Sequence, residues 1–184
     1  MTNPITFSEA FVDVGDNQFL RHVTHEIMMD NKVIGHFLFT EYDWLRAHEM
    51  NTVRSWLDRE GTYLGRLSKY LLDSGHKIAT LSDVISQGLG AQGQCVIIDD
   101  VSISPYYMGL GIEMHVIGRF MKSWEMKFSF AMCPGWDFLC DRMAIQDKDK
   151  VEMLNKVGLY PLDDYMMLRY LDDEFLNSFV VSGA

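Results

Sequence analysis

The chain has 184 residues, 48% of them hydrophobic, and its 26 acidic and 16 basic residues give a net charge of −10. This length and composition can bury one sizeable core, so we expect a single domain over residues 1–184. The acidic balance argues against a protein that binds nucleic acid by neutralising phosphates. No apolar run approaches the ~20 residues that cross a bilayer. An acidic surface suits a cationic substrate or a basic partner, although it also simply keeps a protein soluble.

The first residues and the cysteines favour a cytoplasmic protein. The segment MTNPITFSEAF lacks the basic and apolar regions of a secretion signal. Cys95, Cys133 and Cys140 are odd in number and have apolar or aromatic neighbours. We therefore expect reduced core thiols rather than a disulfide.

The N-terminal part predicts a β-hairpin. Residues 5–19 fit either a short helix or a first strand, and the sequence leaves both open. The segments 22–29 and 32–42 then flank Asp30-Asn31, a polar pair that suits a two-residue turn. His22 and His25 would point to opposite faces of such a strand, so we expect no metal site there.

The middle of the chain predicts helices. Asn51 or Thr52 could begin a helix that reaches Leu72, and a second short helix would follow within residues 80–87. The run GLGAQG at residues 88–93 matches G-x-G-x-x-G, but it follows a helical segment and precedes a strand. We interpret it as a flexible connection rather than a nucleotide site.

Residues 95–124 contain a strand, a glycine loop and a helix. The β-branched run from Val96 to Ile103 predicts a buried strand, which Pro105 ends. The two glycines at 109 and 111 permit conformations closed to other residues. Apolar residues then recur every four positions from Ile112 to Trp124, which predicts a helix. Free backbone N–H groups at such a helix start favour an anion such as a pyrophosphate.

The C-terminal third predicts three more strands and a helix. A strand over 128–132 should end at Cys133-Pro134-Gly135, and a helix over 146–156 should end at Val157-Gly158-Leu159. The last two strands are expected at 165–170 and 175–181.

The central residues Ile103-Ser104-Pro105-Tyr106-Tyr107-Met108-Gly109-Leu110-Gly111-Ile112-Glu113 resemble the acetyl-CoA-binding motif of the GCN5-related N-acetyltransferases. The resemblance covers residues 95–170 well and 32–42 weakly. It implies an α+β fold with a mixed, mostly antiparallel sheet flanked by helices. In the common family order the helices precede the hairpin. The resemblance therefore implies that the helical segment at about 51–87 is an insertion or a displaced helical layer.

The resemblance also implies which residues hold acetyl-CoA. The backbone of Ser102 and Ile103 would meet the acetyl and pantetheine groups. The loop would hold the pyrophosphate through Met108, Gly109, Leu110, Gly111, Ile112 and Glu113. Two positions depart from the family motif: Met108 replaces Arg or Gln, and Glu113 replaces Gly or Ala. The nearest cations along the sequence after the loop are Arg119 and Lys122.

Catalysis would need a base, and Asp99 and Asp100 are the candidates. Alternating strand side chains would place them on opposite faces, and burial beside the other carboxylate would raise the pKa of the one that acts. The alternatives are a solvated pair at a strand end and a helix-capping contact. Leu154 stands where the family has a tyrosine that protonates the leaving thiolate. The candidates for replacing that tyrosine are Tyr106, Tyr107, Tyr160 and Tyr165, while Cys133 fits a structural thiol better than a nucleophile.

Two functions follow from the resemblance. The first is an N-acetyltransferase that uses acetyl-CoA on an amine of a small molecule or a protein, with no metal, nucleic acid or membrane partner and with an oligomer left open. The second is a catalytically inactive protein of the same fold that binds or inhibits a protein partner. The departures at Met108, Glu113 and Leu154 motivate the second.

Overall fold

The computed structural model describes residues 4–14, 18–43, 46, 94–125, 128, 130–134, 147–161 and 166–170. The helices expected over 51–87, the glycine run at 88–93, the strand at 175–181, Cys140 and Tyr165 lie outside these residues. The described elements, in chain order, are β1 (Ile5–Phe7), β2 (Phe11–Asp13), β3 (Leu20–Met29), β4 (Lys32–Asp43), β5 (Gln94–Ile103), the 3₁₀ turn η1 (Pro105–Tyr107), α5 (Ile112–Trp124), β6 (Phe130–Pro134), α7 (Asp147–Lys156), β7 (Tyr160–Pro161) and β8 (Met166–Tyr170).

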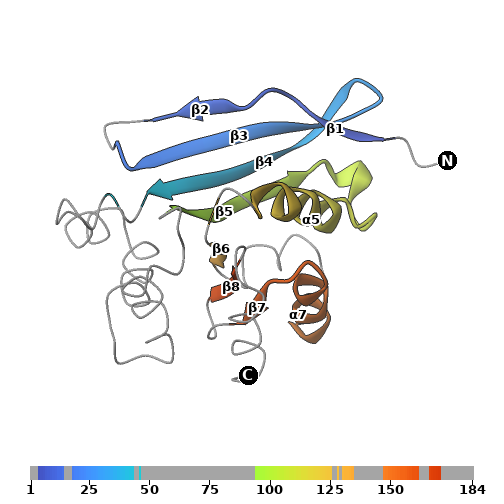
Figure 1. Ribbon diagram of the computed structural model, residues 1–184. Helices are drawn as coiled ribbons and strands as arrows, with labels where there is room; N and C mark the ends of the chain where they lie inside the picture. Colours follow the sequence, from blue (N-terminus) through green and yellow to red (C-terminus); the bar gives the residue numbers. More distant parts are fainter. Residues whose placement is uncertain are drawn as a thin grey trace.

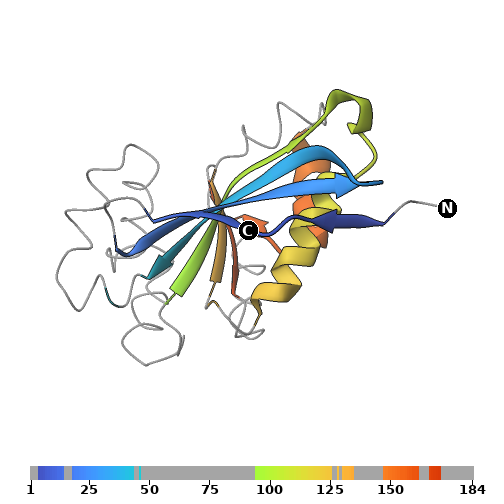
Figure 2. The ribbon, with the colours of Figure 1, turned by 90° about the horizontal axis from the view of Figure 1, so that it is seen from above.

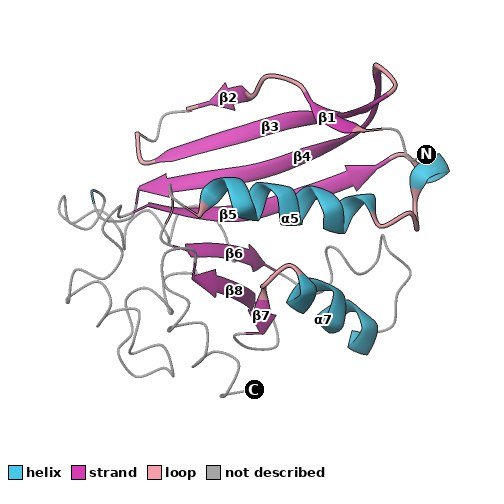
Figure 3. Cartoon of the chain, turned by 45° about the vertical axis from the view of Figure 1, so that its right-hand side comes forward, coloured by secondary structure: helices cyan, strands magenta, loops and turns pink. Residues whose placement is uncertain are grey.

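The strands form one mixed sheet in the order β1-β3-β4-β5-β6-β8-β7, with β2 also paired to β3 (Figure 1). All described neighbours are antiparallel except β5 and β6, which run parallel. Helix α5 crosses one face of this sheet (Figures 2 and 3). The α+β class and the mostly antiparallel sheet expected from the sequence are confirmed.

The hairpin of β3 and β4 is confirmed as well. Asp30 and Asn31 have φ angles of 53° and 59°, the left-handed conformation that a two-residue turn of this kind requires. On the other side of β3, the short strands β1 and β2 pair with its two ends. Strand pairing therefore decides the ambiguous N-terminal segment for residues 5–7 and 11–13.

Helix α5 has the bounds that its four-residue apolar repeat predicts. One stripe of its side chains meets aromatic residues of the sheet: Phe120 lies 4.6 Å from Phe37 between ring centroids, and Trp124 lies 4.9 Å from Phe39. A neighbouring stripe faces the turn after α7, because a Cβ on Gly118 would lie 3.3 Å from Val157 Cγ1. The helix is thus buried along two sides, which fixes the loop that precedes it.

The C-terminal elements differ slightly from expectation. Strand β6 begins and ends two residues later than predicted, and Phe128, expected to open the strand, instead donates its N–H to the Trp124 carbonyl at 3.1 Å. Helix α7 ends as predicted at Gly158, whose φ is 82°. Leu159 N–H closes that end by donating to the Leu154 carbonyl at 3.0 Å. Among the described helices, none combines the length and apolar character needed to cross a membrane.

Candidate functional site

Strand β5 has one open edge. It pairs with β6 only from Cys95 to Ile97, and from Ile98 onward no described strand pairs with that side. Ser104 N–H donates to the Ile34 carbonyl on β4 at 2.7 Å. Because successive residues of a strand direct their backbone groups to alternate edges, Ile103 directs its own groups to the open edge, and so does Val101. An extended ligand could add there as a strand does.

A β-bulge at Asp99 changes the predicted arrangement of the two aspartates. Phe39 pairs with Ile98 whereas Leu38 pairs with Asp100, so Asp99 is an extra residue in β5. Its carboxylate accepts a hydrogen bond from Thr40, two residues from Leu38 and on the same face of β4. Asp99 and Asp100 therefore lie on one face, away from α5. The prediction that they face opposite ways is wrong, because a bulge interrupts the alternation.

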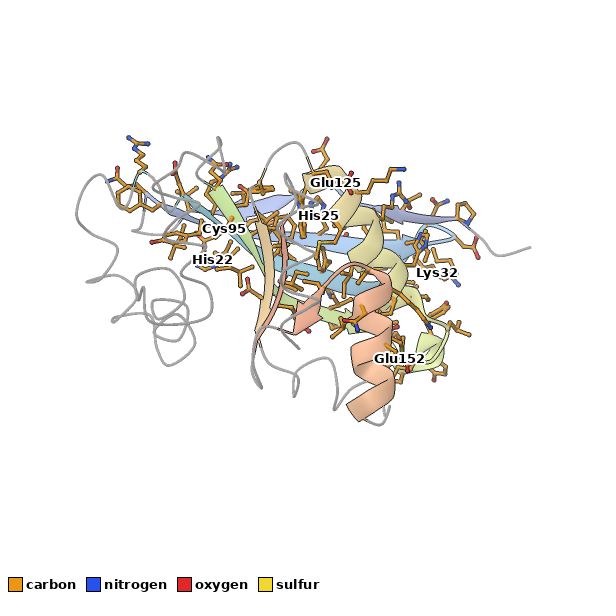
Figure 4. All side chains as sticks on the ribbon, turned by 60° about the horizontal axis from the view of Figure 1, so that its bottom comes forward. His22, His25, Lys32, Cys95, Glu125 and Glu152 are labelled. Atoms are coloured by element: carbon orange, nitrogen blue, oxygen red, sulfur yellow. The ribbon has the colours of Figure 1, made fainter. Side chains whose placement is uncertain are left out.

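A chain of hydrogen bonds reaches Asp99 from β3. His22 Nδ1 lies 2.8 Å from Thr40 Oγ1, and Thr40 Oγ1 donates to Asp99 Oδ2 at 2.6 Å. Thr40 is 4% exposed, whereas His22 is exposed and Asp99 is half-buried. His25 points to the other face, where its ring stacks on Phe39, as the alternation of β3 predicts (Figure 4). The polar chain thus joins three strands at the bulge.

The glycine loop lies at the end of β5, between η1 and α5. Gly109 and Gly111 have φ angles of 78° and 71°, and a Cβ at either would meet nothing within 4 Å. Gly111 is the N-cap of α5 and has no side chain to cap it. The N–H groups of Ile112, Glu113 and Met114 precede the first hydrogen bond of the helix, which His115 N–H makes to the Gly111 carbonyl. This loop therefore offers an open backbone cradle suited to an anion.

The side chains around the loop are mostly apolar and exposed. Tyr106 is 93% exposed, Leu110 67% and Met108 42%. Strand β4 begins at Lys32, at the end of the sheet where the loop lies (Figure 4). Shortly after it, Ile34 and Gly35 lie beside Ser104 and Ile103. No local sequence pattern connects Lys32 with the loop, because only the strand register brings them together.

Arg119 does not extend toward the loop. Its Nη1 donates to the Ile5 carbonyl at 2.8 Å, and its guanidinium carbon lies 5.0 Å from the centroid of the Phe7 ring. This cation therefore holds β1 against α5. Among the described residues of the sheet, Lys32 is the basic residue at the end where the loop lies.

Glu113 is buried although it lies in the first turn of α5. Its side chain is 5% exposed, and Oε2 has no hydrogen-bond partner within the described part of the chain. The positive end of the helix dipole favours a carboxylate here, while desolvation disfavours it. Glu113 shares the stripe of Ile117 and Met121, so its carboxylate does not project into the solvent in front of the loop.

Other residues singled out in the sequence are part of the core. Leu154 is 4% exposed, so an apolar side chain fills the position of the family tyrosine. Cys95 and Cys133 are buried thiols outside any disulfide, as predicted for them. Burial raises the pKa of Cys95 and the nearby carboxylate of Asp43 raises it further, so the nucleophilic thiolate is disfavoured. The described residues include no group of three or more His, Cys, Asp and Glu side chains arranged for a metal ion.

Comparisons with known proteins give distant matches only. No protein-family model matches the sequence, and no curated protein matches it. A crystal structure of a mutant agmatine N-acetyltransferase in its apo form has 8% identity and a TM-score of 0.44, covering 80% of this chain and 73% of that one. A polyamine N-acetyltransferase from Drosophila melanogaster, which forms N-acetylagmatine, has 9% identity and a TM-score of 0.44, covering 80% and 74%. Similarity at this level carries no inference about activity or substrate.

Proposed function

We propose that the protein is an N-acetyltransferase that uses acetyl-CoA on a primary amine. The observation that carries this proposal is the continuity of the open edge of β5 with the glycine loop. The edge presents the backbone of Val101 and Ile103, and the loop leads to the N–H groups of Ile112, Glu113 and Met114, which precede the first hydrogen bond of the helix. A ligand with an extended amide-bearing arm and a pyrophosphate at its end complements both, and an acyl-CoA has this composition.

The length of the site supports the same ligand. Asp99 lies four residues before Ile103, about 13 Å along an extended strand. With the pyrophosphate at the loop, the pantetheine arm would run along the edge of β5 and bring the thioester toward the bulge. The carboxylates of Asp99 and Asp100 lie at that position, on the face away from α5. One of them would take a proton from the amine as it attacks the thioester.

Binding of acetyl-CoA is tested by thermal unfolding. A hundredfold excess over Kd should stabilise the protein by about 2.7 kcal/mol, which raises the melting temperature by about 5–10 °C. Gly109→Asp should abolish the increase, because it places a negative charge in the cradle at a position with open space, where the positive φ is one that Asp adopts more often than most residues. Gly118→Ala, which lies on helix α5 and outside the loop, should retain the increase. An increase that persists in Gly109→Asp would place the site elsewhere, and no increase in the unsubstituted protein would refute the proposal.

A second candidate is a protein that binds acyl-CoA without transfer. The observation that favours it is Leu154, which fills the position of the family's general acid with a buried hydrocarbon side chain. Thiol release from acetyl-CoA, measured with alkyl amines, polyamines and lysine peptides as acceptors, separates the two. Release that requires an amine supports the transferase, whereas binding without release under every acceptor supports the second candidate.

A further inference from the structure

We propose that Thr40 and His22 are positioning residues for Asp99, and that Asp99 rather than Asp100 accepts the proton of the amine. This inference rests on the proposed function and goes beyond it, because it chooses between the two carboxylates and adds two residues from other strands. The observation behind it is the hydrogen-bond chain from His22 through Thr40 to Asp99.

The direction of this chain follows from its donors. A threonine hydroxyl carries one proton, and that of Thr40 is directed to Asp99 Oδ2 at 2.6 Å. His22 Nδ1, 2.8 Å from the same oxygen, must then donate. His22 therefore carries its proton on Nδ1 when it is neutral, and Asp99 is the final acceptor of the chain.

The burial of Thr40 strengthens the hydrogen bonds that join His22, Thr40 and Asp99. Thr40 is 4% exposed, so its hydrogen bonds form where water competes little. A distance of 2.6 Å is typical of a hydroxyl that donates to a carboxylate. Such a bond favours the ionised form of Asp99 and restricts its orientation. Asp100 pairs with Leu38 in the register of β4 and β5.

The chemical step requires an ionised and oriented base at the bulge. The amine nitrogen attacks the thioester carbonyl, the new nitrogen–carbon bond forms and the carbon–sulfur bond breaks. The electron pair of that bond leaves with the thiolate, which takes a proton from water. The proton released by the nitrogen goes to the carboxylate of Asp99, whose place in the bulge adjoins the open edge of β5.

The test compares two substitutions at Thr40 with the same change at a matched position. Thr40→Val removes the hydroxyl and keeps the shape, whereas Thr40→Ser keeps the hydroxyl. Thr24→Val is the control, because Thr24 lies on β3, on the same face of the sheet as Thr40, and is half-buried. We expect kcat for amine-dependent thiol release to fall about tenfold in Thr40→Val and to change less than about threefold in the other two, with KM for acetyl-CoA unchanged. We also expect a larger loss in Asp99→Asn than in Asp100→Asn.

The pH profile separates positioning from mere packing. Without the hydroxyl the ionised form of Asp99 is less favoured, so the acid limb of kcat in Thr40→Val should move up by about one pH unit. Other titratable groups face the chain from the neighbouring strands, and they are the same in all variants. They are Asp13, Glu26, His36, Tyr42, Cys95 and Asp100. A profile of Thr40→Val that overlays that of Thr40→Ser would overturn the inference.

A measurement that does not depend on turnover completes the test. Nitrogen NMR of the imidazoles should show His22 as the Nδ1–H tautomer in the unsubstituted protein and a loss of that preference in Thr40→Val. An Nε2–H tautomer in the unsubstituted protein would refute the chain. Failure of the proposed function has a different signature, since the unsubstituted protein would then release no thiol with any amine and Asp99 would have no proton to accept.

Discussion

One buried phenol, that of Tyr42, makes the free energy of unfolding depend on pH. Tyr42 is 2% exposed, and its hydroxyl has no hydrogen-bond partner in the described ranges. Burial is the main cause that raises the pKa of this phenol above its ordinary value of 10.0, with Cys95 and Asp43 adding to the effect. The folded state therefore keeps a proton that the unfolded state loses at high pH.

This linkage predicts how Tyr42→Phe behaves in alkali. The stability contribution of Tyr42 is fully present below pH 10, and it is lost as the pH rises further because only the unfolded chain ionises. Urea unfolding between pH 8 and 11 should show the free energy of unfolding of the unsubstituted protein falling more steeply than that of Tyr42→Phe. The difference in slope should approach about 1.4 kcal/mol per pH unit. Parallel curves would show that Tyr42 ionises equally in both states.

At Gly35, β4 lies close to the backbone at the end of β5. A Cβ on Gly35 would overlap the carbonyl oxygen of Ser102, which is backbone and cannot turn aside. In contrast, a Cβ on Gly118 would lie 3.3 Å from Val157 Cγ1, at the end of a side chain. The two positions therefore differ in whether they can accept a larger side chain, although both lie inside regular elements.

Replacing each glycine by alanine should separate these cases. Gly35→Ala should lower the free energy of unfolding by about 1–3 kcal/mol, because the strands must separate to admit the methyl group. Gly118→Ala should stay within about 1 kcal/mol of the unsubstituted protein, since the gain in helix propensity offsets the tighter contact. Urea midpoints measure both changes. Equal effects would mean that the register of Gly35 and Ile103 is not held as rigidly as the pairing implies.

The elements that the sequence predicts well are those with a local signal. The apolar repeat of residues 112–124 gives α5 its bounds, and Asp30-Asn31 specifies the hairpin turn. The bulge has no such signal, because the apolar residues that flank the pair Asp99-Asp100 fit either alternation. The partners of the polar chain lie 18 and 59 residues apart in the sequence. Only the pairing of β3, β4 and β5 brings them together, so the site could be predicted at its loop but not at its bulge.

At the scale of the whole molecule, β5 connects the two parts of the candidate site. Its start pairs with β6, its middle carries the bulge and the carboxylates, and its end leads into the glycine loop. Helix α5 and the hairpin fix the strand from one face and one edge. The other edge stays open beyond Ile97 in the part of the sheet that the structure describes. One strand therefore sets the distance between an anion cradle and a candidate base.

Amide NMR during addition of acetyl-CoA tests whether the ligand lies along β5 and the glycine loop. We expect the largest chemical-shift changes at Val101, Ile103 and the segment from Gly109 to Met114, with smaller changes along β1 and β2. Desulfo-CoA should reproduce the changes at the loop, because it keeps the pyrophosphate. Changes confined to other parts of the chain, or none at millimolar acetyl-CoA, would show that β5 and the glycine loop do not bind the ligand.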